Sequence, residues 1–288
     1  MKFYKSGNGI KGKGINKFSL KCEEEKDKWL NILDILYKND AYTCVILKGL
    51  YDNKKDIVLK AGIKEAIEKE YEIAKELNNL PNFIRYYCKF ICFDDLLETI
   101  KNYDLSSTYR LCEKGKNQIG ILTMNYYSLG SIGTYKWNEK NLQELKNVLK
   151  QTVYSYILAF SRLGFIHGHL HCDNVLLKNK RVFEIDYDFK KLAIDKFEVR
   201  IMDFEKSRIN KNFEFRQVLN DIQKLFNSIS TNENYSVEFS YNNDALRKMK
   251  NKIIVDNIKS HSINKTYFDD LDLIIDSFDV EYIKTINY

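Results

Sequence analysis

The sequence predicts an α+β protein with a strand-rich first part and a mainly helical second part. Apolar runs rich in β-branched residues, such as Tyr42–Leu50 and Asp56–Gly62, are typical of strands, and a polar turn joins these two. From Phe213 onward, apolar residues instead recur at helical spacing. Strands followed by helices favour two lobes over an alternating parallel sheet.

The break between the lobes is predicted near Tyr126–Thr134. Residues 1–124 are assigned to a basic N-terminal arm and a small strand-rich lobe. Residues 125–288 are assigned to a hinge and a helical second lobe, so the chain forms one bilobal domain.

Composition excludes several classes of protein. The 288 residues are 44% hydrophobic, which is enough for a core, and one proline and 12 glycines exclude collagen-like or Pro/Gly-rich disordered chains. No apolar run approaches the roughly 20 residues of a membrane helix, and the N-terminus lacks the apolar stretch of a signal peptide. The net charge of +6 is spread along the chain and gives no specific signal for nucleic-acid binding.

The cysteines indicate a reducing compartment. The six cysteines contain no C-x-x-C pair, and without a secretory signal we expect free, mostly buried thiols in an intracellular, cytoplasmic protein. Abundant Lys, Asn, Ile and Tyr are typical of AT-rich coding sequence, as in large DNA viruses, and a viral protein would lie in the host cytoplasm.

The remaining elements follow from periodicity and from breaker residues. The segment Cys22–Tyr37 fits either a short helix or the approach to a first strand. A helix over Lys64–Leu80 is expected to stop before Pro81. Further strands are predicted over Phe83–Phe93, Gln118–Met124, Val175–Leu177, Val182–Ile185 and Val199–Met202, and further helices over Asn141–Leu163, Phe213–Ser228, Asn243–Lys259 and Phe268–Ile286.

The segment Gly164–Leu177, GFIHGHLHCDNVLL, is the most informative about function. It follows a long amphipathic helix and resembles the catalytic loop of protein kinases, whose signature is H-R-D-L-x-x-x-N. His167, Leu170 and Asn174 take three positions of that signature. His169 stands where the catalytic Asp belongs.

Other segments resemble kinase motifs in the family's order. The strand DIVLKAG places Lys60 as the phosphate-contacting lysine, and the following helix places Glu70 as its partner. ILTMNYYSLGSI resembles the fifth strand and the hinge, with Met124 as gatekeeper and Asn125, Tyr126 and Tyr127 facing the adenine. The resemblance covers most of residues 38–228. It implies a bilobal kinase-like fold and a protein that binds ATP and magnesium.

VRIMDFEKSRI resembles the strand that leads into D-F-G. It places Asp203 with Asn174 as magnesium ligands, which suits the oxygen ligands that this cation prefers. Glu205 replaces the glycine of D-F-G. Asp186 is a rival for the role of Asp203, and the preferred assignment implies an inserted β-hairpin before Asp203, as in some giant-virus kinase-like proteins.

The predicted phosphate loop, Lys38–Val45, departs from the family. Val45 takes the position of the loop valine, whereas Lys38, Asp40 and Thr43 stand at the three glycine positions. Side chains there are expected to weaken or reshape ATP binding, because glycines allow the backbone to approach phosphates closely. A second match to G-x-G-x-x-G at residues 7–12 is more simply a basic arm.

These departures favour a pseudokinase that acts through a protein partner, with residual Mg-nucleotide binding. The segment between Glu205 and Asp221 contains no A-P-E motif and leaves little room for an activation segment. Asp221 stands at the start of a helix that resembles the buried αF helix of kinases. The alternative is an active atypical Ser/Thr kinase that phosphorylates a protein substrate, with His169 or Asp173 as base.

A third possibility is a metal hydrolase built on the alternating histidines. On an extended segment His167, His169 and His171 would point to one side, where Cys172 and Asp173 could complete a zinc site. The only other histidine is His261, so a two-metal site would need carboxylate ligands.

Overall fold

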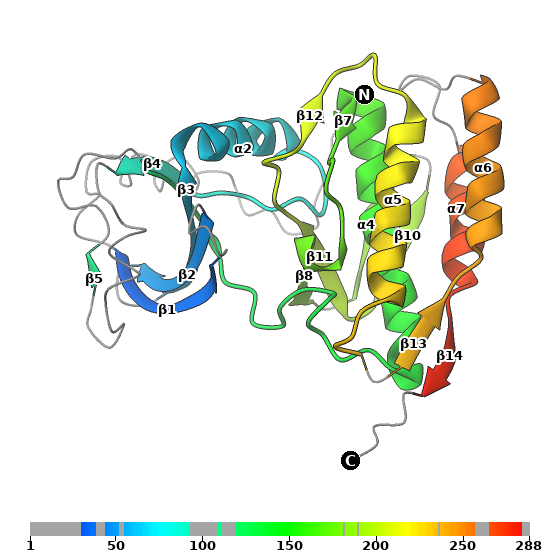
Figure 1. Cartoon of the computed structure of the whole chain (residues 1–288), viewed down its shortest axis with the longest axis horizontal. Coiled ribbons are helices and arrows are strands. Elements are labelled where there is room, and N and C mark those ends of the chain that lie inside the picture. Colours follow the sequence, from blue (N-terminus) through cyan, green and yellow to red (C-terminus); the bar gives the residue numbers. More distant parts are fainter. Residues whose placement is uncertain are drawn as a thin grey trace. The chain divides into compact units, whose positions relative to one another are not determined.

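The computed structural model describes residues 30–38, 44–51, 55–92, 109–110, 119–180, 182–188, 190–235, 237–256 and 265–283. They form two compact units (Figure 1). The first takes the described residues up to Tyr71 and again from Arg85 to Tyr126, and the second takes Glu72–Ile84 and the described residues from Tyr127 onward. The α+β prediction is confirmed.

The first unit is an antiparallel sheet of six strands in the order β4-β6-β3-β2-β1-β5. Side chains on β2 alternate: Val45 and Leu47 are buried, and their neighbours are less so. For Cys22–Tyr37 the sequence left a helix or a strand open, and the described part of this segment, from Leu30 onward, is a strand. The strands are β1 (Leu30–Lys38), β2 (Cys44–Tyr51), β3 (Lys55–Ile63), β4 (Cys88–Cys92), β5 (Tyr109–Arg110) and β6 (Ile119–Asn125).

Helix α2 (Lys64–Leu77) follows β3 directly and lies close to β6. A Cβ atom on Gly120 of β6 would stand 2.6 Å from Cβ of Ile67, so the approach requires glycine. The helix ends at Leu77 rather than at the predicted Leu80, because the next residues form a turn in which the Leu80 amide donates to the Leu77 carbonyl.

The strand predicted over Phe83–Phe93 starts only at Cys88. Its first residues belong to the second unit, where the amide of Ile84 donates to the carbonyl of Ile201 and Phe83 forms a parallel bridge with the same residue. The prediction is therefore wrong for this part, because a partner distant in sequence takes the backbone hydrogen bonds.

The second unit is built around helix α4 (Leu142–Leu163). Residues 151–160 of α4 are all buried, as expected for a helix covered on every side. Gly164 ends the helix with φ 69°, and its amide donates to the Phe160 carbonyl. The helix predicted over Asn141–Leu163 is confirmed.

Helix α5 (Phe215–Ser230) contacts α4, and α7 (Lys265–Asp276) packs on another side of α4 (Figure 1). Helix α6 (Asn243–Asp256) contacts both α5 and α7.

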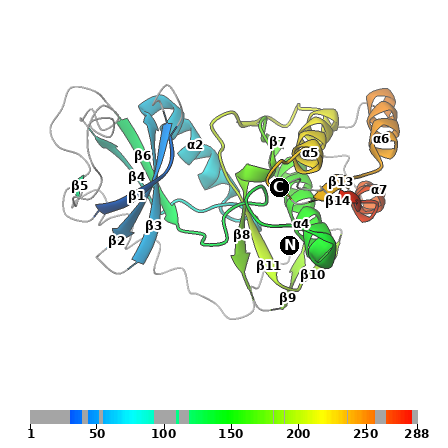
Figure 2. The ribbon, with the colours of Figure 1, turned by 60° about the horizontal axis from the view of Figure 1, so that its bottom comes forward.

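Small antiparallel pairs of strands lie beside α4, which contacts β7, β10 and β11 (Figure 2). The inserted hairpin predicted before Asp203 is confirmed: β9 and β10 pair with each other between β8 and β11, which also pair. The strands are β7 (Phe165–Ile166), β8 (Val175–Asn179), β9 (Phe183–Asp186), β10 (Lys191–Ile194), β11 (Phe197–Ile201) and β12 (Arg208–Ile209).

The helix predicted over Phe268–Ile286 is wrong in its second half. Helix α7 ends at Asp276, and β14 (Asp279–Ile283) pairs with β13 (Val237–Ser240), a strand that the periodicity did not indicate. The fully buried Phe278 stacks on Tyr241, the residue after β13, with ring centroids 5.2 Å apart. This contact between distant segments decides in favour of the strand.

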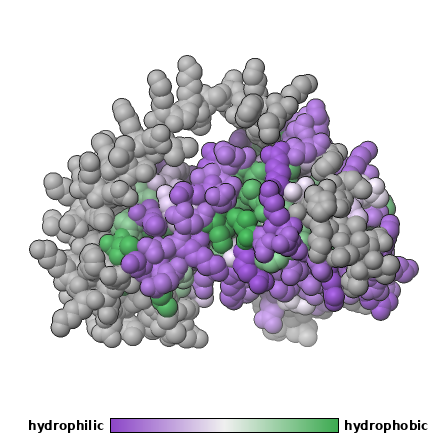
Figure 3. All heavy atoms as spheres, turned by 90° about the horizontal axis from the view of Figure 1, so that it is seen from above, coloured by the Kyte–Doolittle hydropathy of each residue, from purple (hydrophilic) through white to green (hydrophobic). Residues whose placement is uncertain are grey.

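The cysteine prediction is partly overturned. Cys172 is a buried free thiol, but Cys88 is disulfide-bonded, and spacing alone does not reveal pairing. Within the described ranges, no helix is long and apolar enough to cross a membrane. On the face drawn in Figure 3, most described residues are hydrophilic and hydrophobic ones form small areas.

Candidate functional site

Lys60 and Glu70 form a buried ion pair within the first unit. Nζ of Lys60 donates to Oε2 of Glu70 at 2.7 Å, and the two side chains are only 4% and 1% exposed. The hydroxyl of Tyr86 donates to the other carboxylate oxygen of Glu70. A buried carboxylate with both oxygens bonded has a fixed orientation, so Lys60 is held at one place on β3.

The register of the sheet shows which predicted residues share a face with Lys60. Lys60 pairs with Ile46 and with Leu122, and Val58 pairs with Met124. Residues directly opposite in an antiparallel pair point to the same side. Met124, 1% exposed, therefore lies on the face of Lys60.

Other predicted nucleotide-binding residues lie elsewhere. Val45 pairs with Ala61, and Asn125 pairs with Ile57, so both point to the face opposite Lys60. The structure thus brings Ile46, and not Val45, to the side of Lys60, because a shift of one residue reverses the face.

The remaining residues predicted to bind nucleotide lie after β6 and at the end of β1 or beyond it. Tyr126 follows β6, and its ring lies 4.5 Å from Nζ of Lys48. Lys38 is the last residue of β1, whereas Asp40 and Thr43, like the match at residues 7–12, lie outside the described residues.

In the second unit, a buried carboxylate on α5 holds the loop from Gly164 to Asn174 through hydrogen bonds. Oδ2 of Asp221 accepts hydrogen bonds from the Gly168 amide and the Tyr156 hydroxyl, each at 2.7 Å. The Tyr156 oxygen in turn accepts from the amide of His167 at 3.1 Å. Asp221 is 2% exposed, so the loop rests on a charged group shielded from water.

His167 is fully buried and joins this loop to Met202. Nε2 lies 3.0 Å from the Met202 carbonyl, and Nδ1 accepts from the His169 amide. Burial lowers the pKa of His167 to about 4. The ring is therefore neutral at neutral pH, with its proton on Nε2, and has a structural role.

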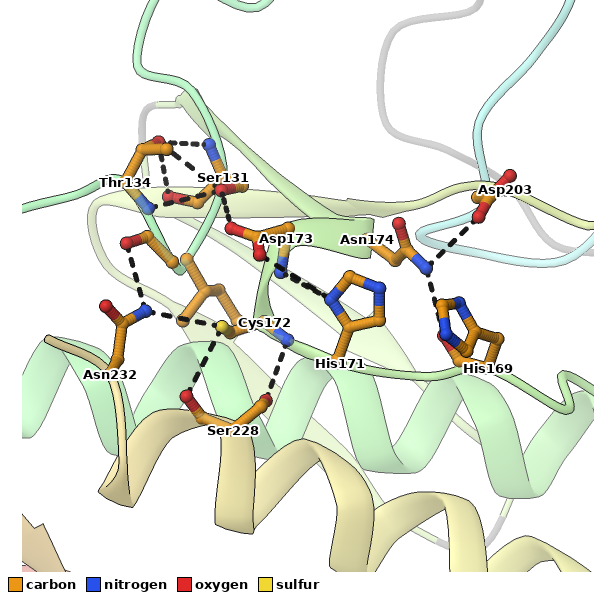
Figure 4. Close-up of polar contacts among 12 residues, drawn as sticks. Ser131, Thr134, His169, His171, Cys172, Asp173, Asn174, Asp203, Ser228 and Asn232 are labelled. Carbon is orange, nitrogen blue, oxygen red and sulfur yellow. Dashed lines mark hydrogen bonds and ion pairs between the residues drawn. The ribbon is translucent and has the colours of Figure 1, made fainter. Parts of the chain in front are cut away.

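Asn174 and Asp203 are brought together at the end of the loop (Figure 4). The amide nitrogen of Asn174 donates to the His169 carbonyl at 2.9 Å and to Oδ2 of Asp203 at 3.3 Å. The Met202 amide donates to the Asn174 carbonyl, so residue 202 is fixed on both sides. Asp203 has φ 69°, an uncommon backbone conformation for a residue with a side chain, of the kind that clusters at functional sites.

The rival Asp186 lies on β9, where its carboxylate accepts the amide of Asp188 in the inserted hairpin. Phe204, after Asp203, is fully buried against His167 and Phe165, and Glu205 is exposed in the next turn. Helix α5 begins at Phe215, so only residues 204–214 lie between Asp203 and this helix.

His169 is half-buried beside the Asn174–Asp203 pair. Burial, with smaller effects of His171 and Lys206, lowers the pKa of His169. Its imidazole is therefore neutral at neutral pH and has a lone pair that can accept a proton.

Asp173, the other candidate base, turns away from this pair. Oδ1 accepts from the hydroxyl of Ser131 at 3.2 Å, and the Asp173 amide donates to Nδ1 of His171 at 3.3 Å (Figure 4). The hydrogen bond to Asp173 raises the pKa of His171 to about 9. In the imidazolium, the Nδ1 proton instead points to Oδ2 of Asp173, 3.6 Å away.

The zinc-site alternative gains no support from the geometry. His167 is engaged with Met202, and the rings of His169 and His171 stack edge to face with centroids 4.7 Å apart. Among the described side chains, no group of three or more His, Cys, Asp or Glu is arranged to hold a metal ion.

Sequence reasoning missed the residues that hold the predicted ones in place. Tyr86 orients Glu70, and Gly120 admits α2 to the sheet. Neither belongs to a motif, although a glycine inside an apolar strand pattern is a signal of close backbone approach. The sequence places Asp221 on a helix but does not indicate its contact with the Gly168 amide.

Comparison with known proteins adds no identity. No protein-family model matches the chain, and no curated protein is significantly similar to it in sequence. Its function therefore has to be inferred from the residues themselves.

Proposed function

We propose that this protein is a divergent kinase-like, Mg-nucleotide-binding protein with weak or absent phosphotransfer, which acts mainly by binding a protein partner. The observation that carries the proposal is the Asn174–Asp203 pair, whose amide nitrogen and carboxylate oxygen lie 3.3 Å apart beside His169. A histidine occupies the place where the kinase resemblance expects a carboxylate base.

The two side chains fit a magnesium ion chemically. Carboxylate and amide oxygens are the ligands that this hard cation prefers. Because the Asn174 amide uses its nitrogen for both hydrogen bonds, its oxygen is left for a cation. When bound, magnesium would neutralise phosphate charge.

The ion pair of the first unit supports the same proposal. A lysine ammonium held by Glu70, whose carboxylate Tyr86 orients, is a suitable partner for nucleotide phosphate. The kinase resemblance gives Lys60 and Glu70 these roles, and the bilobal kinase-like fold is part of the proposal.

Calorimetry tests nucleotide binding by comparing Mg-ATP with ATP in EDTA. We expect Asp203→Asn to abolish the magnesium-dependent part of the affinity, because the carboxylate is lost whereas asparagine tolerates the positive φ at this position. Asp186→Asn is the matched control and should bind as the unchanged protein does. Equal binding by both variants, or no nucleotide binding at all, would refute the proposal.

A second candidate is an active atypical kinase with His169 as base, which the neutral, half-buried imidazole beside Asp203 favours. The protein is incubated with labelled ATP, magnesium or manganese and generic protein substrates. Transfer that is lost in both Lys60→Ala and His169→Asn would establish this candidate. Nucleotide binding without transfer supports the pseudokinase.

A further inference from the structure

Two lysines from separate elements border the residue before His169. Lys206 is exposed in the turn after Phe204, and its Cβ atom would lie 3.6 Å from a Cβ on Gly168. Lys224 projects from α5 with its side chain 56% exposed, and its Nζ lies 3.5 Å from the Gly168 carbonyl. Two lysines from different elements thus lie beside Gly168.

A third cation lies on the neighbouring strand pair. Arg208 of β12 is exposed and pairs with Ile166, one residue before His167. Its guanidinium stacks 5.4 Å from the Phe213 ring centroid, which holds it without neutralising it. Lys206, Arg208 and Lys224 are called the basic surface below.

Acidic groups only partly balance the basic surface. Within the described part of the chain, Lys206 and Arg208 form no ion pair, and Lys224 has Asp221 at 3.2 Å. That carboxylate is buried and already accepts from Gly168 and Tyr156. Positive charge therefore predominates on this surface.

We propose that the basic surface binds an extended acidic peptide segment of a protein partner and so brings that segment to His169. The proposal rests on the proposed function, in which partner binding is the main activity. Carboxylates suit both the ammonium groups and the planar guanidinium.

A nucleic acid fits this surface less well. Nucleic-acid binding draws its affinity from many phosphate contacts and, for single strands, from aromatic side chains on which bases stack. The basic surface has three cations, and the aromatic ring that lies against it, Phe213, is already stacked on by Arg208. A short run of carboxylates matches it more closely.

Fluorescence anisotropy tests the proposal with a labelled ten-residue peptide of alternating Glu and Ser and with its Gln-for-Glu counterpart. The variant K206E/K224Q is compared with K140E/K248Q, which changes net charge equally at exposed lysines of other segments. We expect the acidic peptide to bind about tenfold more weakly to the first variant and within about twofold to the control. The neutral peptide should bind to neither.

Three outcomes would overturn the proposal: no binding of the acidic peptide, equal loss in both variants, or tighter binding of an oligothymidine strand that the first variant loses. If K206E/K224Q does not fold by circular dichroism, K206E alone serves, because the Lys206 ammonium has no partner to lose within the described residues. Mg-ATP affinity is measured on the same proteins. If the unchanged protein does not bind Mg-ATP, the proposed function is refuted. The peptide measurement then still decides by itself whether the basic surface binds an acidic segment.

Discussion

Lys60 and Glu70 lie ten residues apart in sequence and meet at 2.7 Å in an environment that excludes water. Both charges are shielded from water, so each compensates the other. Breaking such a pair by removing one partner strands a buried charge, whereas replacing both with apolar groups can be nearly neutral.

We therefore predict non-additive effects at this pair. Lys60→Met and Glu70→Leu should each lower the free energy of unfolding by about 3–5 kcal/mol, and the double variant should recover a large part of that loss. Urea denaturation of the four proteins of the cycle measures this. A double variant that loses the sum of both would show that the pair is not coupled.

Gly120 is predicted to resist substitution. Gly120→Ala places a methyl group 2.6 Å from Cβ of Ile67 and should cost about 1–3 kcal/mol, because α2 has to move away from β6. Adding Ile67→Ala relieves only contacts beyond Cβ, so it should not restore stability. Thermal unfolding of the single and double variants tests this, and a neutral Gly120→Ala would contradict the close packing.

Asp221 is predicted to be the main support of the loop Gly164–Asn174. Asp221→Ala leaves the Gly168 amide and the Tyr156 hydroxyl without their acceptor and should cost about 2–4 kcal/mol. The Gly168 amide should also exchange its hydrogen much faster. Asp188→Asn, in the exposed hairpin, is the control and should leave exchange at Gly168 unchanged, because asparagine tolerates the positive φ of this residue.

His167 is predicted to make the protein sensitive to acid. Burial keeps the pKa of His167 near 4 in the folded chain, against 6.5 for an unperturbed histidine. The contribution of neutral His167 to the free energy of unfolding is complete above pH 6.5. It falls by up to about 3 kcal/mol as the pH drops toward 4, because the unfolded chain takes up a proton that the folded chain does not.

The measurement is the free energy of unfolding against pH for the unchanged protein and for His167→Gln, which cannot titrate. Carboxylates titrate in both proteins, so their difference isolates His167. The two curves should converge as pH falls from 6.5 to 4. Parallel curves would show that His167 does not remain neutral in the folded protein.

Much of the fold was predictable because its elements carry strong local patterns. The alternation in β2 and the helical spacing in α4 are set by side chains within each element, and both predictions hold within a few residues. The same reasoning failed for Asp279–Ile283, where pairing with β13 overrides an acidic-apolar pattern that also fits a helix.

The candidate site divides in the same way. The sequence by itself determined which residue types are available: a lysine on a strand, a glutamate on the next helix, and Asn174 and Asp203 flanking an inserted hairpin. Only the tertiary structure decided that Ile46 rather than Val45 shares the face of Lys60, and that Asp203 rather than Asp186 meets Asn174. Register and long-range hydrogen bonds decide these pairings, and no local pattern encodes them.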